Sequence, residues 1–192
     1  MECLTRPECV DYAWKVRLDS DDLLGRRRRA AGRKRAAILD SKHTATFIYE
    51  SLLKQSAAVC QLLTECLGDF TWAVLWAYEL PFGDRSTEAE PPGGWGRYAS
   101  WRQAAGESRR LYDAPGHLFA AGERSAVAEA LVFAIRLGWD AVLFGSPPRA
   151  VIRLSHDDDI DIMARSAKEI SRVTDALVRL GLSKSKFARR MG

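Results

Sequence analysis

The stretch DAVLFGSPPRAVIRLSHDDDIDIMAR, residues 140–165, decides the fold because it contains three short apolar runs with turn-forming residues between them. The runs are residues 141–144, 150–154 and 160–163, and they are rich in Val and Ile, which favour strands. The segments between them, Gly-Ser-Pro-Pro and Ser-His-Asp-Asp, contain residues that often form turns. The pattern therefore predicts three strands that follow one another as an antiparallel meander.

The last of these strands alternates between charged and apolar residues, as Asp159-Ile160-Asp161-Ile162. Successive side chains of a strand point to opposite faces, so the isoleucines share one face and the aspartates share the other. Such alternation is typical of a strand with one face in the core and one in water. We therefore expect Ile160 and Ile162 to face the core, and Asp159 and Asp161 to face water.

The sequence around this unit predicts another strand and several helices. TWAVLWAYEL, residues 71–80, is apolar on both faces, which favours a central strand that is covered on both sides. Weak alternation favours a further strand within residues 11–18. Apolar residues three to five apart predict helices over residues 44–67, 95–112, 122–138 and 166–180.

These elements together predict one α+β domain, with an antiparallel sheet of about four strands and two to four packing helices. We expect this domain to cover residues 44–182. Residues 1–43 form a basic N-terminal region that could be flexible, and residues 183–192 form a basic C-terminal tail.

Composition indicates a globular protein, because 47% of the 192 residues are apolar and six are Trp. No apolar run approaches the roughly 18 residues that a membrane helix needs, and the N-terminal residues lack the pattern of a secretory signal. We therefore expect a cytoplasmic protein with no membrane partner. In that compartment the four cysteines, Cys3, Cys9, Cys60 and Cys66, should be free thiols.

Charge is unevenly distributed along the chain. Residues 50–164 carry 10 Lys/Arg against 16 Asp/Glu, whereas residues 1–49 carry 11 against 7 and residues 165–192 carry 8 against 2. Near the N-terminus the basic residues are concentrated at Arg26, Arg27, Arg28, Arg29, Arg33, Lys34 and Arg35. Dense like charges repel one another, so a solvated linker or a charged helix end is the first interpretation. Contact with a phosphate backbone or an acidic partner is the alternative.

The Gly-Ser pair and the aspartates also permit a catalytic interpretation. Gly145 and Ser146, followed by Asp159 and Asp161, resemble the signature of the polymerase-beta-like nucleotidyltransferases. The resemblance implies that the two aspartates bind Mg²⁺ and that Gly145 and Ser146 approach the nucleotide phosphates. Three features oppose this resemblance. The family usually adds a third carboxylate from a later strand, but here the later carboxylates lie in a predicted helix. A strand-like Pro-Pro-Arg-Ala-Val-Ile segment follows the Gly-Ser pair where a helix should begin, and little chain remains to complete such a domain.

His117 and His156 are the histidines of the predicted domain. With Asp157 or Asp159 they could form a metal site, or they could act as a general base with an orienting acid. Nothing in the sequence shows that the two histidines meet in space. The first interpretation is therefore that His117 bonds within its own turn and that His156 is a surface turn residue.

Three motifs, APGHLF at residues 114–119, LGWDAVLF at 137–144 and SHDD at 155–158, occur here in this order. Their order, with a helix after the first, resembles a family of uncharacterised bacterial proteins, and the resemblance covers about residues 70–165. It implies a sheet from Asp140 onward with Ser155, His156 and Asp157 at a turn, and it implies no activity.

The sequence therefore favours a non-enzymatic, cofactor-free module that binds another protein, and an immunity-type role would fit its acidic body. Trp95 and Trp101 could anchor such a partner if they are exposed. The competing hypotheses are a Mg²⁺-dependent nucleotidyl- or phosphoryl-transfer enzyme that uses Asp159 and Asp161, and nucleic-acid binding through the basic termini.

Overall fold

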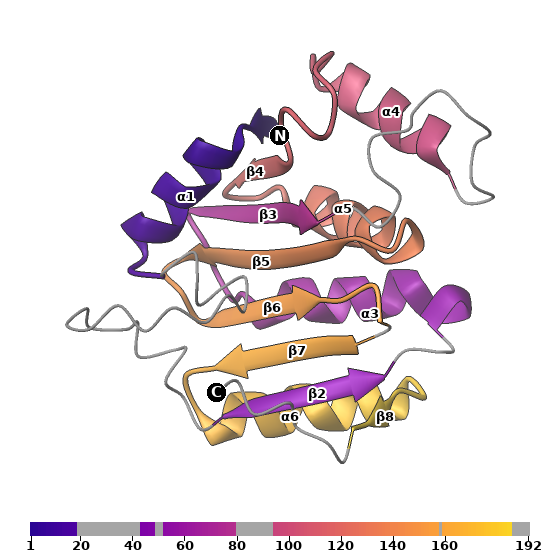
Figure 1. Cartoon of the computed structure of the whole chain (residues 1–192). Helices are drawn as coiled ribbons and strands as arrows, with labels where there is room; N and C mark the ends of the chain where they lie inside the picture. Colours follow the sequence, from indigo (N-terminus) through magenta and orange to yellow (C-terminus); the bar gives the residue numbers. More distant parts are fainter. Residues whose placement is uncertain (19–42, 49–51, 80–93, 158, 186–192) are drawn as a thin grey trace.

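The apolar runs between residues 140 and 164 form the antiparallel strands β5 (Asp140–Ser146), β6 (Ala150–Leu154) and β7 (Asp159–Ala164), which confirms the predicted meander. The computed structural model describes residues 1–18, 43–48, 52–79, 94–157 and 159–185. Within these residues it has five helices and one open sheet of eight antiparallel strands (Figure 1). The α+β class was predicted correctly, but the expected four strands and two to four helices were too few.

The meander lies in the middle of the sheet, whose strand order is β1-β4-β3-β5-β6-β7-β2-β8. The other strands are β1 (Glu2–Leu4), β2 (Thr44–Ile48), β3 (Trp72–Glu79), β4 (Gly116–Ala120) and β8 (Ser183–Lys184). As predicted, β3 is a central strand with buried side chains on both faces. The remaining four strands, which the sequence did not predict, have two to five residues each.

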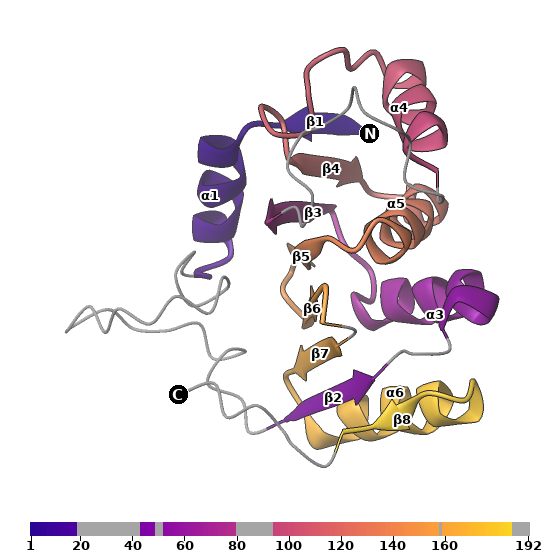
Figure 2. The same cartoon turned by 45° about the vertical axis from the view of Figure 1, so that its right-hand side comes forward.

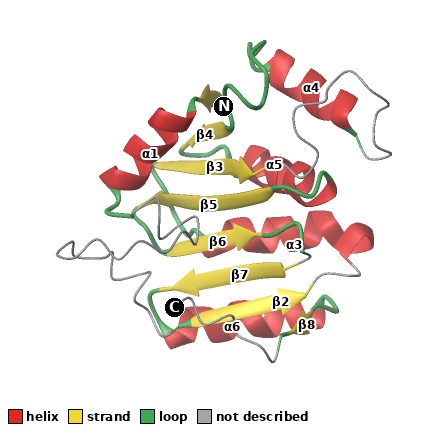
Figure 3. Cartoon of the chain, in the orientation of Figure 1, coloured by secondary structure: helices red, strands yellow, loops and turns green. Residues whose placement is uncertain are grey.

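The sheet separates two apolar cores. On one face, which we call the helical face, α3 (Leu52–Cys66), α5 (Arg124–Arg136) and α6 (Ala167–Arg179) cover the strands, and α4 (Trp95–Ala104) lies at the β1 end (Figures 1 and 2). Among the described helices, α1 (Arg6–Lys15) alone packs on the opposite face, which we call the α1 face (Figures 2 and 3). Ile160 and Ile162 face the helical core, as expected.

Two segments adopt structures other than the predicted ones. Residues 11–15 end α1 instead of beginning a strand, because Thr5 and Glu8 form a capping box that starts the helix upstream. The Thr5 amide donates to the Glu8 carboxylate at 2.7 Å. Residues 44–48 form β2 instead of the start of a helix, since Thr-Ala-Thr-Phe-Ile is rich in β-branched residues.

Residues that precede the predicted domain boundary at residue 43 belong to the same fold. β1 pairs with β4, and α1 packs against the sheet through Cys9 and Ala13, which are fully buried. Gly116 of β4 lies so close to Cys9 and Leu4 that a β-carbon at this position would overlap the Cys9 sulfur. At the other end, Ser183 and Lys184 of the predicted tail 183–192 form β8 and pair with β2, so they also belong to the sheet. The Arg-rich run and residues 186–192 lie outside the described residues. No described helix has both the length and the apolar character that crossing a bilayer demands.

Candidate functional site

A row of polar side chains crosses the α1 face of the sheet. Arg153 on β6 is the direct neighbour of Asp161 on β7, and Asp161 is the direct neighbour of Thr46 on β2. On the other side Arg153 is opposite Val142, which in turn is opposite Trp76 on β3. The strand register thus brings together three distant parts of the sequence: β2, β3 and the meander β5–β7.

Asp161 is held within this row by two hydrogen bonds. Its Oδ1 accepts from the Thr46 hydroxyl at 2.7 Å, and its Oδ2 accepts from Arg153 Nη2 at 2.6 Å. The side chains of Asp161 and Arg153 are 8% and 13% exposed. The prediction that Asp161 faces water was therefore wrong: this face of β7 is buried as well, and the carboxylate is paired with a cation, as buried charges require.

A second ion pair, between Asp140 and His156, lies nearer the β6–β7 turn. The backbone amide of His156 donates to Asp140 Oδ1, and its Nδ1 donates to Asp140 Oδ2, both at 2.8 Å. Asp140 is buried at the start of β5, whereas the His156 side chain is 46% exposed. Asp140 raises the pKa of His156 through this hydrogen bond, and Asp157, whose Oδ1 is 3.5 Å from Nε2, adds to the effect.

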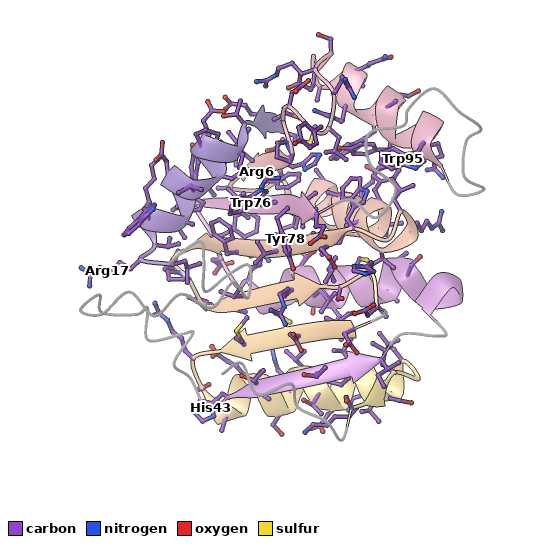
Figure 4. The ribbon with its side chains drawn as sticks, viewed as in Figure 1. Arg6, Arg17, His43, Trp76, Tyr78 and Trp95 are labelled. Carbon is purple, nitrogen blue, oxygen red and sulfur yellow. The ribbon has the colours of Figure 1, made fainter. Side chains whose placement is uncertain are left out.

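Tyr78 lies close to both ion pairs. Burial, helped by Asp140 and opposed by Arg153, raises the pKa of Tyr78 to about 12. The phenol therefore stays protonated at neutral pH. Arg6 of α1 donates from Nη2 to the Tyr78 carbonyl at 3.2 Å, and Figure 4 shows Arg6, Trp76 and Tyr78 in this part of the α1 face. The buried indole nitrogen of Trp76 finds no hydrogen-bond partner among the described residues.

The residues that a nucleotidyltransferase site would need do not converge. Ser146 pairs with Trp72 at one end of β5, whereas Asp161 is level with Val142, four residues along the strand. That separation is about 13 Å at 3.3 Å per residue, and Asp159 at the start of β7 is farther still. Gly145 packs tightly against the Trp72 carbonyl oxygen, 3.0 Å from where its β-carbon would be. The geometry therefore joins Asp161 to Arg153 and Thr46, and not to the Gly-Ser pair.

The two histidines lie on opposite faces of the sheet. His117 on β4 is fully buried on the helical face, where its ring stacks on Trp139. Its Nδ1 faces the Leu75 carbonyl at 3.4 Å, so this nitrogen carries the proton and Nε2 accepts from the Tyr98 hydroxyl at 2.8 Å. Burial and the neighbouring Arg102 lower the pKa of His117 to about 3. This histidine is a neutral core residue.

The cysteines do not form a reactive or metal-binding cluster within the described structure. All four are free, as expected, and burial raises the pKa of Cys9, Cys60 and Cys66 to about 12. In the described parts of the chain, no three or more His, Cys, Asp or Glu side chains converge as a metal site would require. The four thiols are therefore protonated packing residues.

The exposed aromatic residues are not the ones that the sequence suggested. Trp95 (Figure 4) and Trp101 are partly buried in an aromatic cluster with Tyr98. The Trp101 indole donates to Glu129 at 3.0 Å. Trp14 on α1 and Tyr112 before β4 are instead 46% and 66% exposed. Sequence reasoning missed Trp14 because it assigned this segment to a strand, in which the side chain could not be placed relative to the core.

No protein-family model, no curated protein sequence and no solved structure matches the chain.

Proposed function

We propose that this protein is a non-catalytic module that binds another protein, with α1 as part of its docking surface. The observation that carries the proposal is the exposure of Trp14, a large aromatic side chain, on a helix that is firmly attached to the sheet. Trp is enriched among the residues that dominate binding energy at interfaces. Cys9 and Ala13 are buried beneath α1, so the surface that carries Trp14 is pre-organised for docking.

The polar groups of the candidate site support a structural role more than a catalytic one. Both oxygens of Asp161 already accept hydrogen bonds, and both oxygens of Asp140 are bonded to His156. A Mg²⁺-dependent transferase would have to exchange Arg153 and Thr46 for the ion at Asp161. This enzyme is the competing proposal, and it makes an opposite prediction about added metal.

Charge does not identify the partner. Residues 50–164 carry 10 Lys/Arg against 16 Asp/Glu, an excess of six acidic residues. An acidic body is compatible with an immunity-type role, but it selects no particular partner. We therefore define the partner by an apolar or aromatic contact to Trp14 and not by its charge.

Site-specific crosslinking tests the proposal. A photoreactive phenylalanine analogue at position 14 should crosslink one discrete protein in a lysate of the source cells, and the same analogue at position 112 serves as the control. Binding of that protein should be lost in Trp14→Ala and kept in Tyr112→Ala, which removes an even more exposed aromatic ring. Equal crosslinking at both positions, or full binding by Trp14→Ala, would overturn the proposal.

A further inference from the structure

A stripe of basic residues runs along the outer surface of α6. Helical residues are about 100° apart, which places Lys168, Arg172, Asp175 and Arg179 within an arc of about 60°. All four are exposed, and they lie opposite Val173 and Leu177, which are buried against the core. We propose that this stripe, called the α6 stripe below, binds the phosphate backbone of nucleic acid.

The length and charge of the α6 stripe suit a phosphate backbone. Lys168 and Arg179 are eleven residues apart, or about 16 Å along the helix, which matches about five base pairs of duplex. Arg165, exposed just before the N-cap Ser166, extends the positive surface at the start of the helix. Lys and Arg bind phosphates by displacing condensed counterions, so a row of cations without a shaped pocket is sufficient for such binding.

Two carboxylates reduce the positive charge of the α6 stripe. Asp175 lies within the stripe, four residues before Arg179, where it reduces the attraction for phosphate. Glu169 lies beside the stripe, half-buried, and its carboxylate accepts from the Ser166 hydroxyl at 3.1 Å. If phosphate binds here, removal of the Asp175 charge should strengthen binding.

Nucleic acid fits this surface better than a lipid membrane does. A helix that lies on a membrane needs an apolar face that can enter the lipid beside its basic face. The apolar face of α6 is already buried against the sheet, and Val178 is the one large apolar side chain exposed on this helix. The surface therefore offers charge without an inserting face, which favours a hydrated polyanion.

Fluorescence anisotropy with labelled duplex DNA and single-stranded RNA tests the proposal on the full chain. Wild type should bind at low salt, with an affinity that falls steeply as salt rises. The triple variant Lys168→Gln/Arg172→Gln/Arg179→Gln should bind at least about tenfold more weakly, and its slope of log K against log salt on duplex should be shallower by about 2.7. Asp175→Asn should bind more tightly than wild type.

The matched control neutralises three exposed arginines elsewhere, Arg97, Arg110 and Arg136, which changes net charge equally. An equal loss in this control would show that net charge alone drives binding, and would overturn the assignment to α6. Binding that is insensitive to the α6 variants would assign it to other basic segments. Binding to phosphatidylserine vesicles but not to nucleic acid would also overturn it. These outcomes are independent of the Trp14 experiment.

Discussion

Removal of the Asp161 carboxylate should destabilise the fold substantially, because it leaves Arg153 without its counter-ion. Loss of one partner of a buried ion pair typically costs 3–5 kcal/mol. With 13% of its side chain exposed, Arg153 regains some hydration, so we expect Asp161→Ala to lower the free energy of unfolding by about 3 kcal/mol. For a chain of this size that corresponds to a fall in Tm of about 6–12 °C.

The size of this effect can be apportioned with two further variants. Thr46→Val removes one hydrogen bond to the carboxylate and should cost about 1.5 kcal/mol. The double variant Arg153→Met/Asp161→Leu replaces the ion pair with apolar side chains. It should recover most of the loss, because no unpaired charge remains. Urea unfolding followed by Trp fluorescence, with the slope m compared between variants, measures each value.

A structural role for Asp161 requires a particular relation between these losses of stability. The losses in the single variants Asp161→Leu and Arg153→Met must be strongly non-additive in the double variant, since either substitution breaks the same ion pair. A loss below about 1 kcal/mol in Asp161→Ala, or additive losses in the double variant, would refute a structural role for this carboxylate.

Three other perturbations test separate parts of the structure. Asp140 raises the pKa of His156 above its ordinary value of 6.5, so the pair stabilises the fold fully below pH 6.5 and less as the pH rises through the folded-state pKa. The stability difference between wild type and His156→Gln should therefore shrink from pH 6 to pH 8, and a constant difference would contradict the ion pair. The pKa of His117 is lowered to about 3, so ¹⁵N NMR should show a neutral ring until the pH approaches that value, and a ring that titrates near pH 6.5 would contradict this environment. Tyr98→Phe leaves the buried Nε2 of His117 without a donor and should cost about 1–3 kcal/mol in urea unfolding. Gly116→Ala should cost about 1–3 kcal/mol or more in the same assay, because the new β-carbon overlaps the Cys9 sulfur. Adding Cys9→Ala should recover part of that loss, and no recovery would place the strain elsewhere.

The sequence predicted the elements whose signals are local. The meander was predictable because each strand has β-branched residues and each connection has turn residues. Helix α5 was predictable because its apolar residues repeat at helical spacing and Gly138, with a positive φ of 63°, follows its end. Strands β1, β2 and β8 were not predictable, because their pairing partners lie far away in the sequence.

The candidate site was less predictable because burial on the α1 face depends on the whole sheet. Alternation in β7 correctly separated Ile160 from Asp161, but it could not show that both faces are covered. The Asp140–His156 pair had a usable signal. Once the meander is accepted, the start of β5 and the β6–β7 turn must lie at the same end of the sheet. The exposure of Trp14 had no such signal in the sequence, because it can be inferred only when the helix and its packed face are known.

The most direct test of a non-catalytic role is the response of the wild-type protein to metal and nucleotide. Thermal unfolding should be followed in EDTA, in excess Mg²⁺ or Mn²⁺, and in metal with each nucleoside triphosphate. Because both Asp161 oxygens are engaged by Thr46 and Arg153, we expect the same Tm in all conditions. A metal-dependent rise in Tm with a nucleoside triphosphate, abolished in Asp159→Asn, would contradict the structural role and restore the transferase.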